Sequence, residues 1–367
     1  IYRSPWSVGS ASARGHREHT LLAASGAQLK AEAPSSTDLF CLVATYKLYY
    51  PGFYAFAAVC LKPGLSIRFL MRALVTGGAG FIGGHLVEKL VERGWDAIVF
   101  DNFERASLET LKALPPEAEL RRVDVRDLDS MKRYADDVDV IFHLAALTDV
   151  VESEAKRDEY WSVNVLGTEN ALKVARDLGA KLVFTSSAAV YGELSEAARE
   201  DLKPNPISFY GVTKLEGEKL CMKYHEEYGV DVVVLRLFNV FGERARAGVV
   251  KIFLERAREG KPLIIYGDGE AVRDFIYVGD VVDALIEAAL SEEASGKVLN
   301  IGSGKPIRVR ELAEAIAGEA GVEIIHESER RGEIRFSLAD ISLAKKLLNW
   351  SPKIYLLDWL RSSLQPR

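Results

Sequence analysis

A glycine-rich turn between an apolar run and a helical pattern constrains this sequence more than any other feature. Residues 72–76 form a short apolar run, and Gly77, Gly80 and Gly83 follow it at intervals of three. Glycines at this spacing let the backbone turn tightly and bring the free N–H groups of a helix N-terminus close to a pyrophosphate. A second apolar run, over 97–100, ends at an acidic residue. This combination indicates a dinucleotide-binding βαβ unit.

Asp101 closes this second run, 18 residues after Gly83. A carboxylate at the end of the second strand can accept hydrogen bonds from the ribose hydroxyls of adenosine, and it repels a 2′-phosphate. The sequence therefore predicts NAD as the cofactor in preference to NADP. The alternative interpretation of Asp101 is an ordinary turn residue in the Asp101-Asn102 pair.

Strand-like and helical patterns alternate between Met71 and about Leu237. The two longest helical patterns cover 158–178 and 208–228. Strands that alternate with helices form parallel sheets covered on both faces. The sequence thus predicts an α/β fold, a Rossmann-type doubly wound parallel sheet, with an NAD-binding domain over 71–240. The expected strands are 72–76, 97–100, 120–123, 139–143, 181–185 and 231–235.

Shorter elements follow residue 240, and they predict a smaller C-terminal α/β substrate lobe over 241–367. This change in the length of the predicted strands and helices is the reason for placing a domain boundary there. The expected strands and helices of this lobe cover 262–266, 297–301, 323–325, 248–259, 279–290, 308–319 and 342–348.

Residues 1–70 differ from the rest of the chain in charge and in pattern. They carry seven basic and three acidic residues, against 40 and 50 in the remainder. The apolar stretch 39–61 is long enough to cross a bilayer, but Lys47, Pro51 and Gly52 interrupt it. We expect an over-extended reading frame whose 1–70 extension is not part of the fold. A membrane anchor and, less favoured, a signal peptide are the alternatives.

The charge and the composition exclude several classes of function. The formal charge of −6 argues against nucleic acid as the main partner, because nucleic acid favours a basic surface. The three cysteines form neither a disulfide framework nor a C-x-x-C pair, and the six histidines lack metal-ligand spacing. We therefore expect a cytoplasmic protein without a metal, and without membrane contact unless the 1–70 extension is real.

A tyrosine and a lysine four residues apart form the candidate catalytic pair. Tyr210 and Lys214 would lie on one face of a helix. An ammonium beside a phenol lowers the pKa of the phenol, so such a tyrosine can act as base and acid at a sugar hydroxyl. Ser187 follows the strand 181–185, and parallel sheets bind ligands at the carboxyl ends of their strands. The alternatives are a chance Tyr-Lys pair and a capping serine.

In their order, nine motifs of this sequence resemble those of the NAD-dependent epimerase/dehydratase family. The members of this family are extended short-chain dehydrogenases/reductases that act on nucleotide sugars. The resemblance extends from about Met71 to Pro352. Besides the glycine turn and Asp101-Asn102, the motifs are HLAA, NVLGT, TSSAAVYG, YGVTK, LRLFNVFG, YGDGEAVRDFIYVGD and RRGE.

The resemblance implies a role for each matched residue. Tyr210, Lys214 and Ser187 would be catalytic. The implied NAD contacts, besides the three glycines, are Phe81, Ile82, Asp101, Asn102, Asp124, Val125, Leu144, Ala145, Ala146, Asn164, Tyr210, Lys214 and Phe238. The implied UDP-sugar contacts are Ser187, Asn239, Tyr266, Arg273, Arg330 and Ser337.

The resemblance also favours one reaction within the family. The dehydratases carry an Asp-Glu pair where this chain has Ala188 and Ala189, and decarboxylases usually carry Glu at the second position. We therefore expect interconversion of UDP-sugar C4 epimers, UDP-glucose and UDP-galactose, with the N-acetylated pair included if the small Ser337 leaves room. The alternatives are another NAD-dependent nucleotide-sugar enzyme (a reductase, a decarboxylase or a UDP-glucuronate epimerase) and a non-enzymatic dinucleotide-binding protein.

Three features depart from the family pattern. Thr148 stands where the classical epimerases have a lysine that contacts phosphate, and Glu243 stands in place of a proline. The segment 354–367 matches poorly. The resemblance further implies a homodimer formed through the helices 158–178 and 208–228.

Overall fold

The computed structural model describes residues 21–22, 28–29, 40–46, 55–61, 71–329 and 334–364. Contacts divide the chain into two compact units, 1–70 and 71–367. Within the first unit, β1 (Leu21–Leu22) pairs antiparallel with β2 (Gln28–Leu29), and β3 (Phe40–Tyr46) pairs antiparallel with β4 (Ala55–Leu61). Lys47, Pro51, Gly52 and Arg330 lie outside the described residues.

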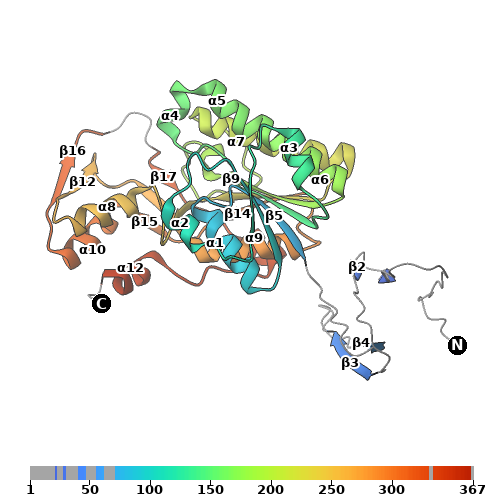
Figure 1. Ribbon diagram of the computed structural model, residues 1–367. Coiled ribbons are helices and arrows are strands. Elements are labelled where there is room, and N and C mark those ends of the chain that lie inside the picture. The colour runs from blue at the N-terminus through green and yellow to red at the C-terminus, as the bar shows by residue number, and fades with distance from the viewer. Residues whose placement is uncertain are drawn as a thin grey trace. The chain divides into compact units, whose positions relative to one another are not determined.

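A seven-stranded sheet forms the centre of the second unit (Figure 1). Every pairing in it is parallel, and the strand order is β14-β10-β9-β8-β5-β6-β7. The chain reverses direction across the sheet between β5 and β8, which is the topological switch point. The predicted doubly wound α/β fold is thereby confirmed. Its strands are β5 (Arg72–Thr76), β6 (Asp96–Asp101), β7 (Glu119–Arg122), β8 (Val140–His143), β9 (Lys181–Ser187), β10 (Val232–Leu237) and β14 (Lys297–Ile301).

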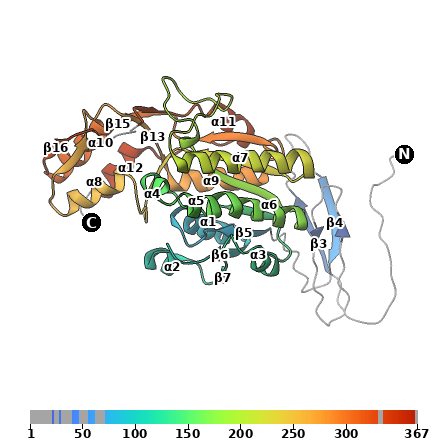
Figure 2. The same ribbon diagram turned by 90° about the horizontal axis from the view of Figure 1, so that it is seen from above.

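Helices cover both faces of this sheet, which is why its strands read as continuous apolar runs. Neighbouring residues of β5 face opposite sides: Val75 packs with α1 and α9, and Leu74 packs with α3, α6 and α7. Figure 1 shows these two layers, and Figure 2 shows α6 and α7 side by side. The covering helices are α1 (Phe81–Glu92), α9 (Val278–Leu290), α3 (Leu128–Tyr134), α6 (Gly167–Leu178) and α7 (Phe209–Tyr228).

The helix expected over 158–178 is interrupted. It consists of α5 (Arg157–Trp161), a single π-helical segment η1 (Ser162–Leu166) and α6. The wide turn carries Asn164, whose buried side chain bonds the backbone of Leu147. Single π turns of this kind occur often at functional sites.

The sequence predicts that the strand 297–301 belongs to the smaller lobe, but the structure places it in the large sheet. As β14 it pairs with β10 at the edge of the large sheet, with Leu299 opposite Leu235. Helix α9 precedes it and packs against α1 and β9. The division at residue 240 is therefore wrong for this segment, because the chain returns to the large sheet after its first excursion.

The smaller lobe contains two further sheets and three covering helices. Strands β11 (Asn239–Phe241), β13 (Val272–Tyr277) and β15 (Pro306–Arg308) form one sheet, which β17 (Phe336–Ser337) joins beside β13. Phe241, Phe253, Leu312 and Leu360 are among its buried core residues. Its other elements are the strand pair β12 (Leu263–Tyr266) and β16 (Ile324–Glu327), with the helices α8 (Val249–Arg258), α10 (Val309–Ala320) and α12 (Leu356–Leu364).

The C-terminal segment is anchored to α9 despite its poor match to the family pattern. Trp350 is buried, and its indole N–H donates to the Asp280 carbonyl at 2.9 Å. The Asp280 carboxylate accepts from the backbone N–H groups of Lys353 and Ile354. The remaining helices are α2 (Leu108–Ala113), α4 (Val150–Ala155), α11 (Ser342–Leu348) and the short 3-10 turn η2 (Ala188–Val190).

Within the described part of the chain, no helix combines the length and apolar character needed to span a membrane. The cytoplasmic location stays a prediction.

Candidate active site

The glycine turn after β5 leaves no room for a Cβ at Gly77 or at Gly83. Gly77 has a φ of +70°, and a Cβ built on it would lie 2.8 Å from the Ala145 nitrogen. A Cβ on Gly83 would lie 2.2 Å from the Gly77 carbonyl oxygen. Gly80 caps α1 without a side-chain hydrogen bond, and the first turn of α1 holds no acidic residue. The N–H groups of this helix start are thus available to an anion.

Asp101 ties the end of β6 to this turn. Its carboxylate accepts from the N–H of Ala79 at 3.1 Å and from the N–H of Phe103 at 2.8 Å. Burial raises the pKa of Asp101, and these two hydrogen bonds act against that rise. The carboxylate therefore lies at the carboxyl end of β6, next to the helix start, as the sequence predicts.

Asn102 and Asp124 lie together beside Asp101. The Asn102 amide donates to the Asp124 carboxylate at 3.0 Å. The Arg126 side chain binds the same carboxylate and lowers the pKa of Asp124 to about 2. Val125 is buried in the core, where a Cβ on Gly167 would meet its side chain. Of this predicted group, only Val125 has no polar side-chain group to offer a ligand.

A buried hydrogen-bond chain, which the sequence analysis missed, joins the two strands at the switch point. Thr168 donates to the Asn164 carbonyl, so its oxygen accepts from His143 Nε2 at 3.1 Å. His143 Nδ1 then accepts from the Thr76 hydroxyl at 2.8 Å. Burial lowers the pKa of His143 to about 3, so the imidazole is neutral. His143 is a polar residue at the end of an otherwise apolar strand, and this pattern in the sequence could have indicated a buried hydrogen bond.

This chain fixes the segment after β8, where Leu144, Ala145 and Ala146 are half-buried. The Ala145 N–H donates to the Thr76 oxygen at 3.3 Å. Asn164 exchanges two hydrogen bonds with the backbone of Leu147 and also donates to Thr213 at 3.0 Å. The amide of Asn164 therefore holds this segment against α7, which is a different use from the predicted contact with NAD.

Tyr210, Lys214 and Ser187 meet at the carboxyl end of β9. Ser187 is the last residue of β9, and Tyr210 and Lys214 are buried on the first turns of α7. Ser208 caps this helix by accepting from the Gly211 N–H at 3.1 Å, which fixes where the helix begins. The three side chains therefore converge, as predicted.

The charge arrangement within this trio differs from the expectation. The Lys214 ammonium donates to the Thr185 carbonyl at 2.8 Å, and burial lowers the pKa of Lys214 to about 8. Burial raises the pKa of Tyr210, and a hydrogen bond with Ser187 acts against that rise. The expected lowering of the Tyr210 pKa by Lys214 is wrong for this structure, because the lysine is used to anchor β9.

The predicted substrate residues lie mainly on the sheet of the smaller lobe. Asn239 starts β11, and its amide donates to the Asp274 carbonyl at 2.8 Å. Arg273 on β13 is the register partner of Ser337 on β17. The structure thus brings these three together, while Tyr266 ends β12 in the separate β12–β16 pair.

The sequence also predicts Phe238 as a contact of NAD and Arg330 as a contact of the UDP-sugar. Phe238 is buried, and its ring centroid lies 6.5 Å from that of Tyr191. Arg330 lies outside the described residues.

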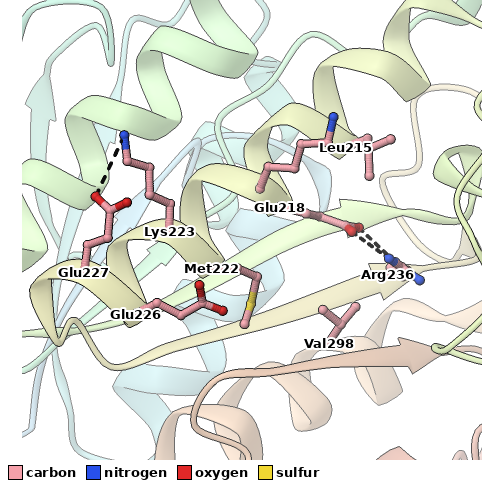
Figure 3. Close-up of a pocket in the computed structure, with 9 residues that line it drawn as sticks. Leu215, Glu218, Met222, Lys223, Glu226, Glu227, Arg236 and Val298 are labelled. Atoms are coloured by element: carbon pink, nitrogen blue, oxygen red, sulfur yellow. Dashed lines mark hydrogen bonds and ion pairs between the residues drawn. The ribbon is translucent and has the colours of Figure 1, made fainter.

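A cavity of about 410 Å³ lies along α7 and contains none of the predicted site residues (Figure 3). A buried ion pair lies in its wall: Arg236 donates to both carboxylate oxygens of Glu218, at 2.9 and 2.7 Å. The Ser186 hydroxyl also donates to Glu218, at 2.5 Å. Ser186 directly precedes Ser187, so the Glu218–Arg236 ion pair helps to hold the end of β9 that carries Ser187. Among the described residues, no cluster of His, Cys, Asp or Glu could hold a metal ion.

Known proteins are similar to this chain in sequence and in structure. Residues 73–302 match the model of the NAD dependent epimerase/dehydratase family. A crystal structure of UDP-glucose 4-epimerase with UDP-glucose from Thermotoga maritima is 36% identical, with a TM-score of 0.76, and covers 80% of this chain and 98% of its own. That of UDP-glucuronic acid 4-epimerase from Bacillus cereus, with UDP-glucuronic acid and NAD, is 34% identical, with a TM-score of 0.75 and the same coverage.

A curated relative differs in the reaction. The UDP-N-acetyl-alpha-D-glucosaminuronate decarboxylase of Bacillus cytotoxicus is 33% identical over 312 residues, which cover 80% of this chain and 97% of the relative. By their names, these relatives differ in the sugar and in the reaction. Both the family match and these identities confirm the resemblance seen in the sequence: this chain belongs to the NAD dependent epimerase/dehydratase family.

Proposed function

We propose that this chain interconverts UDP-sugars that differ in configuration at C4, with UDP-glucose and UDP-galactose as the first candidates. The convergence of Tyr210, Ser187 and Lys214 at the end of β9 carries this proposal. Beside Ser187, the turn η2 presents only Ala188, Ala189 and Val190. None of these side chains can move a second proton, so oxidation and reduction at one carbon is the chemistry that the trio supports.

The first part of the site fits NAD, the cofactor of the family. The crowded glycines Gly77 and Gly83 let the backbone approach a pyrophosphate, and the uncapped start of α1 would bind it. Asp101 would accept hydrogen bonds from the adenosine ribose. When bound, NAD supplies a cationic ring that accepts a hydride from C4 of the sugar and returns it.

The catalytic trio would move the proton that accompanies this hydride. Ser187 would donate a hydrogen bond to the O4 oxygen, and the Tyr210 phenol oxygen would take the O4 proton and give it back. The Lys214 ammonium holds the Thr185 carbonyl, two residues before Ser187. This anchor fixes the end of β9, and with it the distance between Ser187 and Tyr210.

The sugar nucleotide would be held by the sheet of the smaller lobe. Arg273 and Asn239 project from adjacent strands, β13 and β11. A guanidinium suits a diphosphate because its N–H groups form a rigid fork. Arg330 is proposed as a second pyrophosphate contact on the resemblance alone.

Product identification tests this function. The protein should be incubated with UDP-glucose, UDP-galactose, their N-acetylated counterparts and UDP-glucuronate, and the products identified by NMR. We expect mixtures of 4-epimers without added cofactor. Release of CO₂ would identify a decarboxylase, accumulation of NADH a net oxidoreductase, and NAD binding without turnover a non-enzymatic protein.

Asp101→Ala is expected to weaken NAD binding and to relax the rejection of NADP. The change removes the carboxylate that would bind the ribose hydroxyls and repel a 2′-phosphate. Cofactor affinities of both proteins should be measured by calorimetry, with Asp96→Ala at the exposed start of β6 as the control. An unchanged ratio of NAD to NADP affinity would show that another residue distinguishes the 2′-hydroxyl of NAD from the 2′-phosphate of NADP.

Ser337→Tyr is expected to reduce turnover of N-acetylated UDP-sugars selectively. Ser337 lies beside Arg273, so a bulky ring there would occupy space next to the sugar. The loss should reach ~10–200-fold, the usual discrimination by pocket size. Turnover of both sugar pairs should be compared, and equal losses for the two pairs would contradict a size filter.

The expected homodimer stays a prediction. Trp161 and Leu166 are exposed on the α5–η1 segment, which is compatible with an apolar contact there.

A further inference from the structure

The turn after β11 holds an arginine in an unfavourable backbone conformation. Arg244 has a φ of 62°, in the left-handed region that residues with a side chain rarely adopt. Such a conformation persists where surrounding contacts fix it. The side chain of Arg244 is only 8% exposed, so the contacts that fix it are inside the protein.

The Arg244 guanidinium binds two residues of the cofactor helix α1. It donates to both carboxylate oxygens of Glu88, and to His85 Nδ1 at 2.7 Å. Because a guanidinium can only donate, His85 Nδ1 must accept, and the ring proton lies on Nε2. That nitrogen donates to the Glu243 carbonyl at 3.0 Å. Burial lowers the pKa of His85, which favours the neutral ring that this arrangement requires.

The neighbouring residue, Glu243, binds two residues of the smaller lobe. Its carboxylate accepts from the Tyr277 hydroxyl at 2.9 Å and from the Trp359 indole N–H at 3.0 Å. Partial burial would raise the pKa of Glu243, but its own backbone N–H and these two donors hold the pKa below its usual value. Phe241 contacts both rings, with centroid distances of 5.8 and 5.3 Å.

Two consecutive residues thus join three parts of the molecule. Arg244 reaches α1, whose start forms the glycine turn. Glu243 reaches Tyr277, at the end of β13, and Trp359, on α12. Both residues directly follow β11 and Gly242, so the connection reaches the strands that carry Asn239 and Arg273.

We propose that Glu243 and Arg244 are positioning residues that hold the sugar-binding sheet at a fixed distance from the cofactor helix. The proposal rests on the proposed function, in which this sheet holds the UDP-sugar and the start of α1 holds NAD. A shift of the sheet by about 1 Å would misplace C4 relative to Tyr210, and such misplacements are costly. Glu243 and Trp359 both lie where the chain departs from the family pattern, so these two departures supply one connection.

The test uses the NAD-loaded protein with three variants and one control. Arg244→Gln removes the charge and the fork, Arg244→Lys keeps the charge without the fork, and Trp359→Phe keeps the ring but removes the N–H donor. Arg361→Gln is the control, because Arg361 is an exposed arginine of the same helix, α12. The measurements are UDP affinity by calorimetry, KM and kcat for UDP-galactose, thermal stability, and hydrogen exchange of α12.

For Arg244→Gln we expect kcat to fall by about tenfold, the scale of one charge-assisted hydrogen bond, with smaller changes in KM and in the Kd for UDP. Arg244→Lys should fall between this variant and the parent. Trp359→Phe should lower kcat by a smaller factor and speed exchange in α12, without loss of NAD.

An unchanged kcat in both Arg244→Gln and Trp359→Phe would overturn the proposal, as would an equal loss in Arg361→Gln. If Arg244→Gln fails to fold, Trp359→Phe decides the question. If the parent protein binds no UDP, the proposed function fails instead, and exchange in α12 still shows whether the connection holds the helix.

Discussion

Tyr210→Phe is expected to lower turnover by about 10²–10⁴-fold, the usual contribution of a positioned acid–base group. The change removes only the phenol oxygen, so the buried ring keeps its contacts with Leu147 and Tyr160. The glycine turn and Asp101 are untouched, and NAD should remain bound. Turnover and cofactor content should be measured on the same preparation.

Tyr228→Phe is the matched control, because Tyr228 is an exposed tyrosine of the same helix. Near-normal turnover of Tyr210→Phe would remove Tyr210 from the mechanism. The pH profile gives a second readout. A base acts when deprotonated, so turnover should rise with pH through the pKa of Tyr210, which burial holds above its usual value. Ser187→Ala removes a bond that lowers this pKa and should move the rise to higher pH.

The cofactor half could be predicted because its signals are local. A buried parallel strand reads as an apolar run, and a helix start that receives an anion needs glycines whose spacing is visible in the sequence. The backbone around Gly77 and Gly83 then leaves no room for a Cβ, as expected from that spacing. Asp101 followed from its position at the end of a strand.

Features that depend on tertiary contacts could not be predicted. The strand 297–301 has the same apolar pattern whether it pairs in a small lobe or beside β10, and only packing decides. The π turn around Asn164 depends on partners 17 residues earlier, at Leu147, and 49 residues later, at Thr213. Lys214 could be placed beside Tyr210, but its bond to the Thr185 carbonyl needs the distance between α7 and β9.

The buried pair Glu218–Arg236 shows how such contacts support the site without touching a ligand. Both side chains are only 5% exposed. Burial opposes the charge on Arg236, and the hydrogen bonds to Glu218 hold the pKa of Arg236 above its usual value. Glu218 also accepts from Ser186, next to Ser187, the proposed catalytic serine. The pair therefore joins α7, β9 and β10 immediately behind the trio.

Glu218→Leu is expected to lower the free energy of unfolding by about 3–5 kcal/mol, because it leaves the buried guanidinium of Arg236 without its carboxylate. The double variant Glu218→Leu/Arg236→Met should be clearly more stable than this single variant, since it removes both charges together. Chemical denaturation of the NAD-loaded proteins measures both. Glu216→Leu, which breaks the surface pair with Lys219 on the same helix, should cost no more than about 1 kcal/mol.

Stability and catalysis should separate in the double variant. Its Ser186 hydroxyl has lost its acceptor, so β9 is held less firmly beside Tyr210 even where the fold is restored. We expect kcat to fall while KM and NAD content stay near those of the parent, because neither the sugar sheet nor the glycine turn is altered. If the double variant is as unstable as Glu218→Leu, burial of an unpaired charge is not the cause. If it is stable with unchanged kcat, the ion pair stabilises the fold alone and does not position Ser187.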